Sequence, residues 1–159
     1  MIICGLDLGS RNLGLSLIET FEDESKLPRL IKADYLHLTA DKIGDRLNVV
    51  LKRLEKEIED NLVDMIVFED SVFSGRNAPG LMYVAGIFHL VASIYDLPIR
   101  NPKPTQIKKE ITGNGKADKH EVEIAILKMI SNPPPSFVND HASDACSIAL
   151  YGYFKYGQK

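Results

Sequence analysis

The first 38 residues carry hydrophobic side chains at alternating positions, and this period of two limits the chain to folds that begin with β-strands. Residues 2–8 form a largely apolar run, Gly9-Ser10 has the residue types of a tight turn, and residues 12–19 alternate between apolar and small or polar side chains. Residues 30–38 repeat the strand pattern after an acidic loop. Three consecutive strands joined in this way predict an antiparallel meander.

At residue 41 the hydrophobic period changes to three and four residues. Residues 41–61 predict an amphipathic helix with Thr39 or Asp41 as its N-cap, and residues 63–68 predict a buried strand parallel to the first. Further helices are expected over 79–95, 104–110, 118–130 and 139–154, and a short edge strand over 97–99. The order βββαβαβααα predicts an α/β fold in a single domain over residues 1–159. Its mixed five-stranded sheet, an antiparallel meander plus two parallel strands, is flanked by helices.

Composition limits where such a domain would work. Apolar residues make up 45% of the chain and charged residues 26%, as in ordinary globular proteins, and no 18-residue apolar run could span a membrane. The chain starts in a strand-like segment with no signal-peptide pattern before it. Cys4 and Cys146 fall in a predicted central strand and an apolar helix, so we expect buried free thiols and a cytoplasmic protein.

The net charge of −3 is unusual for a nucleic-acid enzyme, but the charges are unevenly distributed. Residues 19–24 hold four acids and no base, whereas residues 100–119 are rich in cations, namely Arg100, Lys103, Lys108, Lys109, Lys116 and Lys119. This asymmetry favours one acidic and one basic face. On charge alone, however, Lys108 and Lys109 are better explained as the solvated side of a helix.

Acidic residues follow two of the predicted strands and begin the last helix. They are Asp7 after the first strand, Glu69 and Asp70 after the fourth, and Asp140 and Asp144, with His141 between them, in the final helix. Spacings of three and four residues place this last group on one helical face. If the first and fourth strands are parallel neighbours, Asp7 and Glu69 end at one sheet edge about 5 Å apart. Ligands bind at such edges in α/β proteins.

Carboxylates gathered at one edge repel one another unless a cation neutralises them, and hard oxygen ligands suit Mg²⁺ or Mn²⁺. Two such ions about 3.5–4 Å apart can activate a water and stabilise the leaving oxygen in phosphodiester hydrolysis. Each acid alone has a simpler explanation, because an Asp at a strand end is usually a turn residue and Asp140 is typical of an N-cap. Asp7 argues most strongly for a site, since it ends a predicted central strand, where an unpaired charge is costly.

Four motifs in this order resemble those of the RuvC family of Holliday-junction resolvases. They are residues 5–14 (GLDLGSRNLG), Phe68-Glu69 followed by Val72-Phe73, residues 107–119 (IKKEITGNGKADK) and residues 140–149 (DHASDACSIA). The first motif alone is weak, since it also resembles the phosphate loop of actin-like ATPases. Those enzymes need two such domains, which 159 residues cannot supply. The ordered set is specific and covers nearly the whole chain.

The resemblance implies the RNase H-like fold and a Mg²⁺-dependent endodeoxyribonuclease. Such an enzyme binds branched DNA as a homodimer and makes paired nicks near the centre of four-way junctions. Metal binding is implied for Asp7, Glu69, His141 and Asp144, with two Mg²⁺ ions per active site that Mn²⁺ can replace, and Lys119 joins them as a catalytic residue. DNA contacts are implied for Phe73, Arg76, Arg100, Lys103, Lys108, Lys109, Lys116 and Lys119.

The chain departs from the family pattern in ways that keep alternatives open. Asp70-Ser71 adds a residue before the Val-Phe pair, so Asp70 is an alternative ligand to Glu69, as Asp140 is to His141. The helix from Pro79 is more apolar than the family pattern suggests, and we predict a dimer surface there. Phage-encoded relatives commonly diverge in this way, which leaves a RuvA- or RuvB-type partner open.

Two other functions are compatible with the same residues. One is a related RNase H-like nuclease that acts on other branched DNA or on RNA, because the acids are indifferent to the sugar. The other is a non-catalytic protein that binds junctions and has kept the fold.

Overall fold

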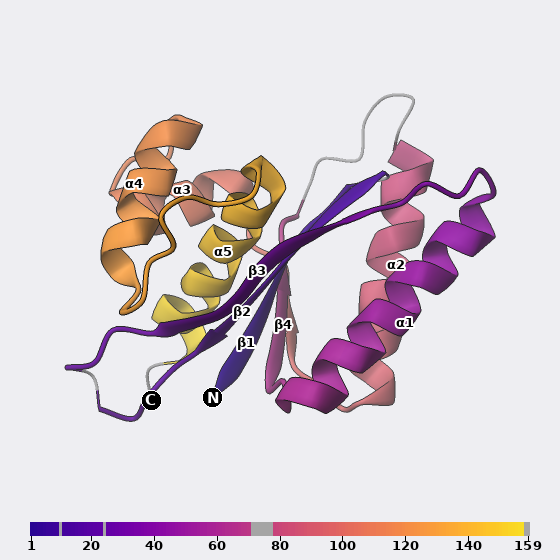
Figure 1. The fold of residues 1–159 in the computed structure, drawn as a ribbon, viewed down its shortest axis with the longest axis horizontal. Coiled ribbons are helices and arrows are strands. Elements are labelled where there is room, and N and C mark those ends of the chain that lie inside the picture. The colour runs from indigo at the N-terminus through magenta and orange to yellow at the C-terminus, as the bar shows by residue number, and fades with distance from the viewer. Residues whose placement is uncertain (10, 24, 71–77, 158–159) are drawn as a thin grey trace.

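The computed structural model describes residues 1–9, 11–23, 25–70 and 78–157, which form one mixed sheet with helices on both faces (Figure 1). The strands are β1 (Ile2–Asp7), β2 (Asn12–Glu19), β3 (Arg29–His37), β4 (Met65–Phe68) and β5 (Ile99–Arg100). They lie in the order β3-β2-β1-β4-β5. The first three pair antiparallel, whereas β4 pairs parallel with β1 and with β5. The predicted meander, the two parallel strands and the α/β class are confirmed.

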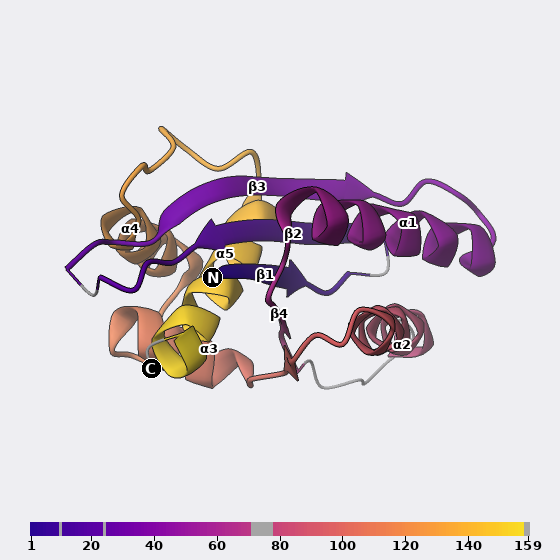
Figure 2. The same cartoon turned by 90° about the horizontal axis from the view of Figure 1, so that it is seen from below.

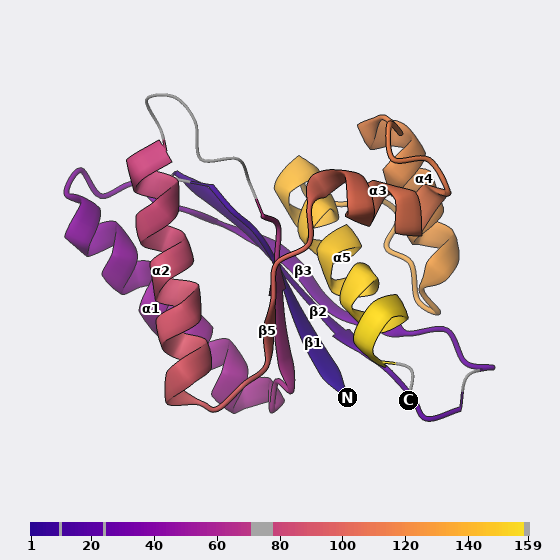
Figure 3. The same ribbon diagram turned by 180° about the vertical axis from the view of Figure 1, so that it is seen from behind.

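The helices form two groups, one on each face of the sheet (Figures 2 and 3). One group is α1 (Ile43–Asn61) and α2 (Ala78–Ile94), which lie side by side. The other is α5 (Asp140–Gly152), with α3 (Pro104–Thr112) and α4 (Lys119–Met129) packed against it. The predicted order of elements is confirmed. Within the described ranges, none of these helices has the length and apolar character needed to cross a bilayer.

The predicted cap of α1 is wrong. Lys42 occupies the N-cap position without a side-chain cap, so neither Thr39 nor Asp41 performs this role. Arg46, in the first turn, instead ties the preceding loop to the helix, because its guanidinium donates to the backbone oxygens of Ala40 and Asp41 at 2.8 and 2.9 Å. As a donor it cannot accept the N–H groups of the first turn, so α1 begins without a side-chain cap.

Two element boundaries also differ from those predicted. The strand expected over 97–99 is observed at Ile99–Arg100, because the backbone N–H of Leu97 instead bonds to the oxygen of Ala92 at 2.8 Å. The regular part of the last helix ends at Gly152, and a short π-helix, η1 (Tyr153–Gly157), follows it.

Side chains alternate across the sheet and build two separate hydrophobic cores. Cys4 and Leu6 belong to the core under α1 and α2. Ile3 and Val67 belong to the core under α3, α4 and α5, which also contains Cys146. Both cysteines are buried free thiols, as predicted, and burial raises the pKa of each to about 12. Such thiols are inert at neutral pH.

Glycines let α5 approach the sheet much more closely than the other helices. A Cβ at Gly5 would lie 2.3 Å from the backbone oxygen of Ala145, and one at Gly14 would lie 2.0 Å from that of His141. Helix backbone therefore rests directly on β1 and β2 at these points. The first turn of α5 is held against the end of β1, where the acidic residues gather.

Candidate active site

Asp7 and His141 are in direct hydrogen-bond contact. Asp7 is the last residue of β1, and the strand alternation turns its side chain toward α5. His141 lies in the first turn of α5, and its Nδ1 is 2.7 Å from Oδ2 of Asp7. The ring N–H donates this bond when the carboxylate is ionised. Burial raises the pKa of Asp7, and the charge of Asp144 adds to this, while the hydrogen bond from His141 opposes it.

The start of α5 is fixed by Asn139 rather than by Asp140. The side-chain oxygen of Asn139 accepts the backbone N–H of Ala142 at 3.0 Å, which makes Asn139 the N-cap. Asp140 is therefore released from the capping role that its position suggests. Its side chain is 75% exposed and bonds to Lys119.

Glu69 and Asp70 are separated by the alternation of β4. Met65 and Val67 face α5, so the same period places Glu69 on the α5 side and Asp70 on the other. The parallel pairing of Leu6 with Phe68 brings the next residues of the two strands, Asp7 and Glu69, beside each other. The backbone N–H of Asp70 donates to the oxygen of Pro102 at 2.8 Å. This arrangement supports Glu69 as the site residue.

A cavity of about 240 Å³ brings three of the predicted acids together. Its described lining is Asp7, Glu69, Pro104, Ile107, Lys108, Lys119, Val122, Asp144 and Ser147. The acids come from β1, from the end of β4 and from α5, and the two lysines come from α3 and α4. Asp70 and Asp140 are not in this lining.

Lys119 is bound to the acids of α5. Its Nζ lies 3.1 Å from Oδ2 of Asp144 and 3.2 Å from Oδ2 of Asp140. Partial burial acts to lower the pKa of Lys119, but the hydrogen bonds and charges of the two carboxylates outweigh it and raise that pKa. Asp118 caps α4 by accepting the N–H of Glu121 at 2.9 Å, which fixes Lys119 as the first helical residue. The ammonium is thus a charged donor at the edge of the cavity.

Lys108 also lines the cavity, and its Nζ donates to the backbone oxygen of Ala117 at 2.7 Å. This bond ties α3 to the segment that enters α4. Lys103, Lys109 and Lys116 are exposed in the same α3–α4 region. Two of the predicted lysines therefore belong to the cavity itself and three to its surroundings.

The remaining predicted DNA contacts lie elsewhere. The guanidinium of Arg100 sits over the ring of Tyr156, 5.1 Å from its centroid, and Arg100 is not in the cavity lining. Phe73 and Arg76 lie outside the described residues.

Sequence reasoning missed Ser147, which lines the cavity. Its Oγ donates to the backbone oxygen of Asp144 at 2.7 Å. Ser147 follows Asp144 by three residues, so the helical spacing already placed the two on one face. That spacing was the available signal.

The donor set suits a hard divalent cation, although the chain's own groups now neutralise it. Within the described ranges, no three His, Cys, Asp or Glu side chains are grouped as metal ligands are. Asp7 is turned toward His141 and Asp144 toward Lys119. Carboxylates from three parts of the chain nevertheless meet in one cavity. Burial raises the pKa of Asp7, and a bound cation would favour its ionised form.

This sheet order, with acids where β1 and β4 end and on a helix across them, defines the class of RNase H-like nucleases. The family model described as "Crossover junction endodeoxyribonuclease RuvC" matches residues 3–151. The protein of that description from Carboxydothermus hydrogenoformans is 29% identical and covers 99% of this chain and 98% of its own. The one from Salinibacter ruber is 32% identical over 94% of this chain and 83% of its own. The chain belongs to the RuvC family, as the motifs predict.

Solved structures confirm the RNase H-like fold. Thermus thermophilus RuvC superimposes with a TM-score of 0.85 at 22% identity, covering 99% of this chain and 98% of that one. The structure described as T. thermophilus RuvC in complex with Holliday junction substrate also gives 0.85, at 23% identity, covering 97% and 93%.

Proposed function

We propose that this chain resolves four-way DNA junctions by metal-dependent phosphodiester hydrolysis, acting as a homodimer that makes paired nicks. The observation that carries the proposal is the cavity in which Asp7, Glu69 and Asp144 meet Lys108 and Lys119. Membership of a family of crossover junction endodeoxyribonucleases supports the reaction. The complex of a similarly folded relative with a Holliday junction supports the substrate. The cytoplasm, where such DNA is found, is the proposed location.

The three carboxylates would hold divalent ions, Mg²⁺ first and Mn²⁺ as a substitute, with two ions per site. When bound, such ions supply Lewis acidity, which makes water easier to deprotonate and stabilises a leaving oxygen. Asp7 is central to the set because Glu69 follows β4, the parallel neighbour of β1, and His141 bonds to Asp7 from α5. Asp70 and Asp140 remain alternative ligands, with the alternation of β4 and the cap at Asn139 favouring Glu69 and His141.

The other side chains have proposed roles in orienting water and phosphate. His141, fixed by its bond to Asp7, would position the attacking water or serve as a ligand. The Lys119 ammonium, at the cavity edge, is the donor placed to stabilise negative charge that develops on the scissile phosphate. Lys108 would bind the same phosphate strand.

DNA binding would extend from the cavity over the α3–α4 region. Lys103, Lys109 and Lys116 are exposed there and would contact phosphates, which is the salt-dependent part of DNA affinity. Phe73 and Arg76, in the segment between β4 and α2, would contact bases and backbone at the branch point. Arg100 would reach DNA only by leaving Tyr156.

The exposed side of α2 is the proposed dimer surface. Its large side chains form an apolar stripe that faces water in a monomer. They are Met82 (56% exposed), Tyr83 (55%), Leu90 (49%) and Ile94 (59%). This surface lies on the sheet face away from α5 (Figure 1). A two-fold axis through it would relate two active sites, as two equivalent strands of a junction require. The whole chain, residues 1–159, would form one nuclease domain in each subunit.

Replacing Asp7 by Asn tests the central assignment. Asp7→Asn keeps the shape and the bond to His141 but removes the charge, so it should bind a four-way junction as wild type does and cut it at least about 100-fold more slowly in Mg²⁺. A thermal scan gives a second readout, because Mg²⁺ should raise the unfolding temperature of wild type but not of Asp7→Asn. Asp23→Asn, an exposed acid in the loop after β2, is the matched control. Normal cutting by Asp7→Asn would refute the metal site.

A substrate panel separates the proposed function from its alternatives. Four-way, three-way, flap and RNA–DNA hybrid substrates should be cut in decreasing order by a junction resolvase. Preference for a hybrid or a flap would favour the related nuclease. Binding without cleavage in both Mg²⁺ and Mn²⁺ would favour the non-catalytic binder.

A further inference from the structure

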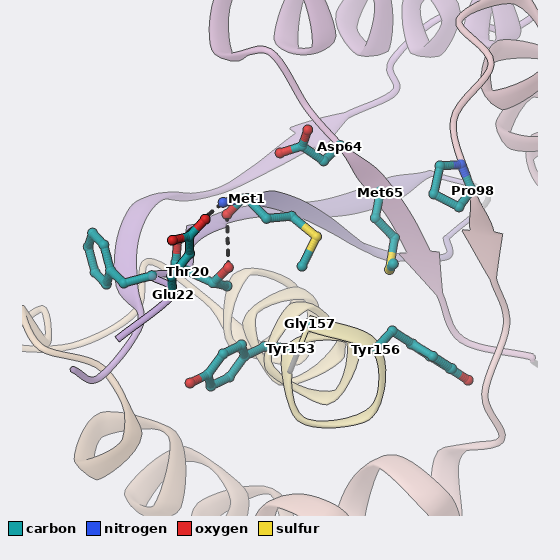
Figure 4. A pocket seen from close by; sticks show the side chains of 10 residues that line it. Met1, Thr20, Glu22, Asp64, Met65, Pro98, Tyr153, Tyr156 and Gly157 are labelled. Atoms are coloured by element: carbon teal, nitrogen blue, oxygen red, sulfur yellow. Dashed lines mark hydrogen bonds between the residues drawn. The ribbon is translucent and has the colours of Figure 1, made fainter. Parts of the chain in front are cut away.

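A second cavity, of about 590 Å³, lies beside Met1 (Figure 4). Met1 precedes the start of β1, whereas Asp7 is at the other end of that strand. Its described lining is Met1, Thr20, Phe21, Glu22, Asp64, Met65, Pro98, Tyr153, Tyr156 and Gly157. These residues come from the start of β1, the end of β2, the start of β4, the approach to β5 and the π-helix. The length of β1 separates this cavity from the acidic edge by about 20 Å. Its volume is in the range of ligand sites, roughly 300–1,000 Å³.

Hydrogen bonds hold the walls of this cavity in place. Met1 is fixed by Thr20, which accepts its terminal ammonium at 3.2 Å and donates to its carbonyl from both the backbone N–H and the hydroxyl. Asp64 is fixed by Ile2, whose N–H donates to the Asp64 carboxylate at 2.6 Å and whose oxygen accepts the Asp64 N–H at 2.8 Å. The site is therefore preformed. The π-helix in its wall is a rare element that often occurs at functional sites.

The chemistry of the walls favours a cation attached to an apolar group. Tyr153, Tyr156 and Phe21 supply rings, and Met1 and Met65 supply thioethers, which pack well against aromatic groups. Glu22 and Asp64 supply two carboxylates. Among the described lining residues none is Lys or Arg, so the Met1 ammonium is the single positive group there.

Two of the wall rings already bind cations of this chain. Arg100 lies 5.1 Å from the centroid of Tyr156, and Lys26 lies 5.9 Å from that of Phe21, although neither cation lines the cavity. These ring faces are therefore engaged outside the cavity, and a basic group inside it would rely on the two carboxylates. The carboxylates in the same lining make nucleic acid an unfavourable occupant, because phosphates would be repelled.

We propose that this cavity docks a segment of a partner protein that presents a basic side chain beside an aromatic or large apolar one. The apolar side chain would lie among the thioethers and tyrosines, and the basic group would bind Glu22 and Asp64. Because the cavity is at the far end of the sheet, such a partner would bind while the acidic edge holds DNA. The surface is separate from the proposed catalytic residues, and Glu22→Gln, which changes no proposed DNA contact, should leave junction cleavage unchanged.

The test uses the full chain and a fluorescently labelled, end-capped peptide, Gly-Arg-Phe-Gly, followed by anisotropy. Wild type should bind it, and replacement of the peptide's arginine by glutamate should abolish binding. Glu22→Gln should weaken binding about tenfold, as expected for loss of a charged hydrogen-bond partner. Tyr156→Leu should weaken it by a similar factor. Glu55→Gln, which removes a carboxylate on α1, should bind as wild type does.

Several outcomes would overturn the proposal. These are no binding of the arginine peptide, equal binding of the glutamate peptide, or affinity unchanged by Glu22→Gln. If arginine amide binds as tightly as the peptide, the occupant of the cavity is a small cationic ligand and not a protein segment. If Tyr156→Leu unfolds, Glu22→Gln still decides the question, since Glu22 is exposed and its replacement should leave the fold intact.

Discussion

The two faces of the sheet are packed in different ways. Under α1 and α2 the strands present full side chains, and Leu13, Leu15 and Leu17 are each at most 2% exposed. Under α5 the strands present Gly5 and Gly14, and helix backbone rests on strand backbone. A layer of side chains separates helix from sheet on the first face. On the second face that layer is interrupted at Gly5 and Gly14, and there the first turn of α5 comes within hydrogen-bond reach of the end of β1.

Two carboxylates, one buried and one half-buried, show the same contrast in electrostatics. Glu57, on α1, accepts bonds from Lys32 at 2.7 and 2.8 Å and from Arg53 at 2.8 Å. Asp7, on the α5 side, bonds to His141, and burial raises its pKa. A buried acid with two cations of its own is a structural element. An acid whose charge is less well compensated can accept a cation from outside, and this contrast supports the proposed metal-binding role of Asp7 rather than one for Glu57.

The largest expected effect on stability comes from the face of the sheet under α1 and α2. Phe88 is fully buried and packs edge-on against Phe68, with ring centroids 5.4 Å apart. Phe88→Ala should lower the free energy of unfolding by about 3–5 kcal/mol through lost burial and a residual cavity. Thermal and denaturant unfolding measure this. Below the unfolding temperature, junction cleavage should keep its wild-type rate, and a large fall in that rate would show that the two faces are not separable.

On the face under α5, a substitution at Gly14 should cost less stability but slow catalysis more. In Gly14→Ala the new methyl would lie 2.0 Å from the backbone oxygen of His141 and 3.0 Å from Cβ of Asp7, so the first turn of α5 must move. We expect a stability loss of about 1–3 kcal/mol. Displacement of His141 by about 1 Å should slow cleavage roughly 100-fold, equivalent to about 2.7 kcal/mol. Single-turnover cleavage of a four-way junction measures the rate.

A wild-type rate for Gly14→Ala would contradict the argument that close approach of α5 builds the site. Junction affinity serves as its internal control, because the lysines of α3 and α4 are not displaced by a change at β2.

The exposed stripe of α2 predicts an effect on assembly alone. Leu90 is 49% exposed, so Leu90→Asp should leave the monomer folded but weaken the proposed dimer by about 2 kcal/mol, close to 30-fold. Sedimentation velocity over a concentration series measures this. Ile124→Asp, at a 40% exposed position on α4, is the matched control and should not change the dimer. A reversed result would place the interface on the α3–α4 side.

Much of this contrast was accessible from the sequence. The alternating leucines of β2 and the helical period of α1 fixed which side chains share a core, and the branched run before Glu69 predicted a strand parallel to β1. The placement of Asp7 beside Glu69 followed from that pairing. Local patterns of this kind are predictable because they depend on residues close in the chain.

Features that depend on distant residues were not accessible. Nothing local to Gly14 shows that the backbone of His141 will lie on it, and nothing local to Arg100 shows that it will choose Tyr156 over the acidic edge. The replacement of Asp140 by Asn139 as the N-cap depends on backbone angles at the helix start. The cavity around Met1 joins five separate segments, so no sequence motif signals it.

The smallest expected effect comes from a glycine-to-alanine substitution on α1, on the other face of the sheet. A Cβ at Gly44, in the first turn of α1, would meet no atom within 4 Å. Gly44→Ala should therefore stabilise the protein by about 0.5 kcal/mol, because alanine reduces the conformational freedom of the unfolded chain and favours the helix. Denaturant midpoints measure the gain, and cleavage should be unchanged. If Gly44→Ala and Gly14→Ala both destabilise the protein, glycine positions in general do not tolerate a methyl group. If Gly44→Ala stabilises and Gly14→Ala destabilises it, the cost arises from the contact between α5 and the sheet.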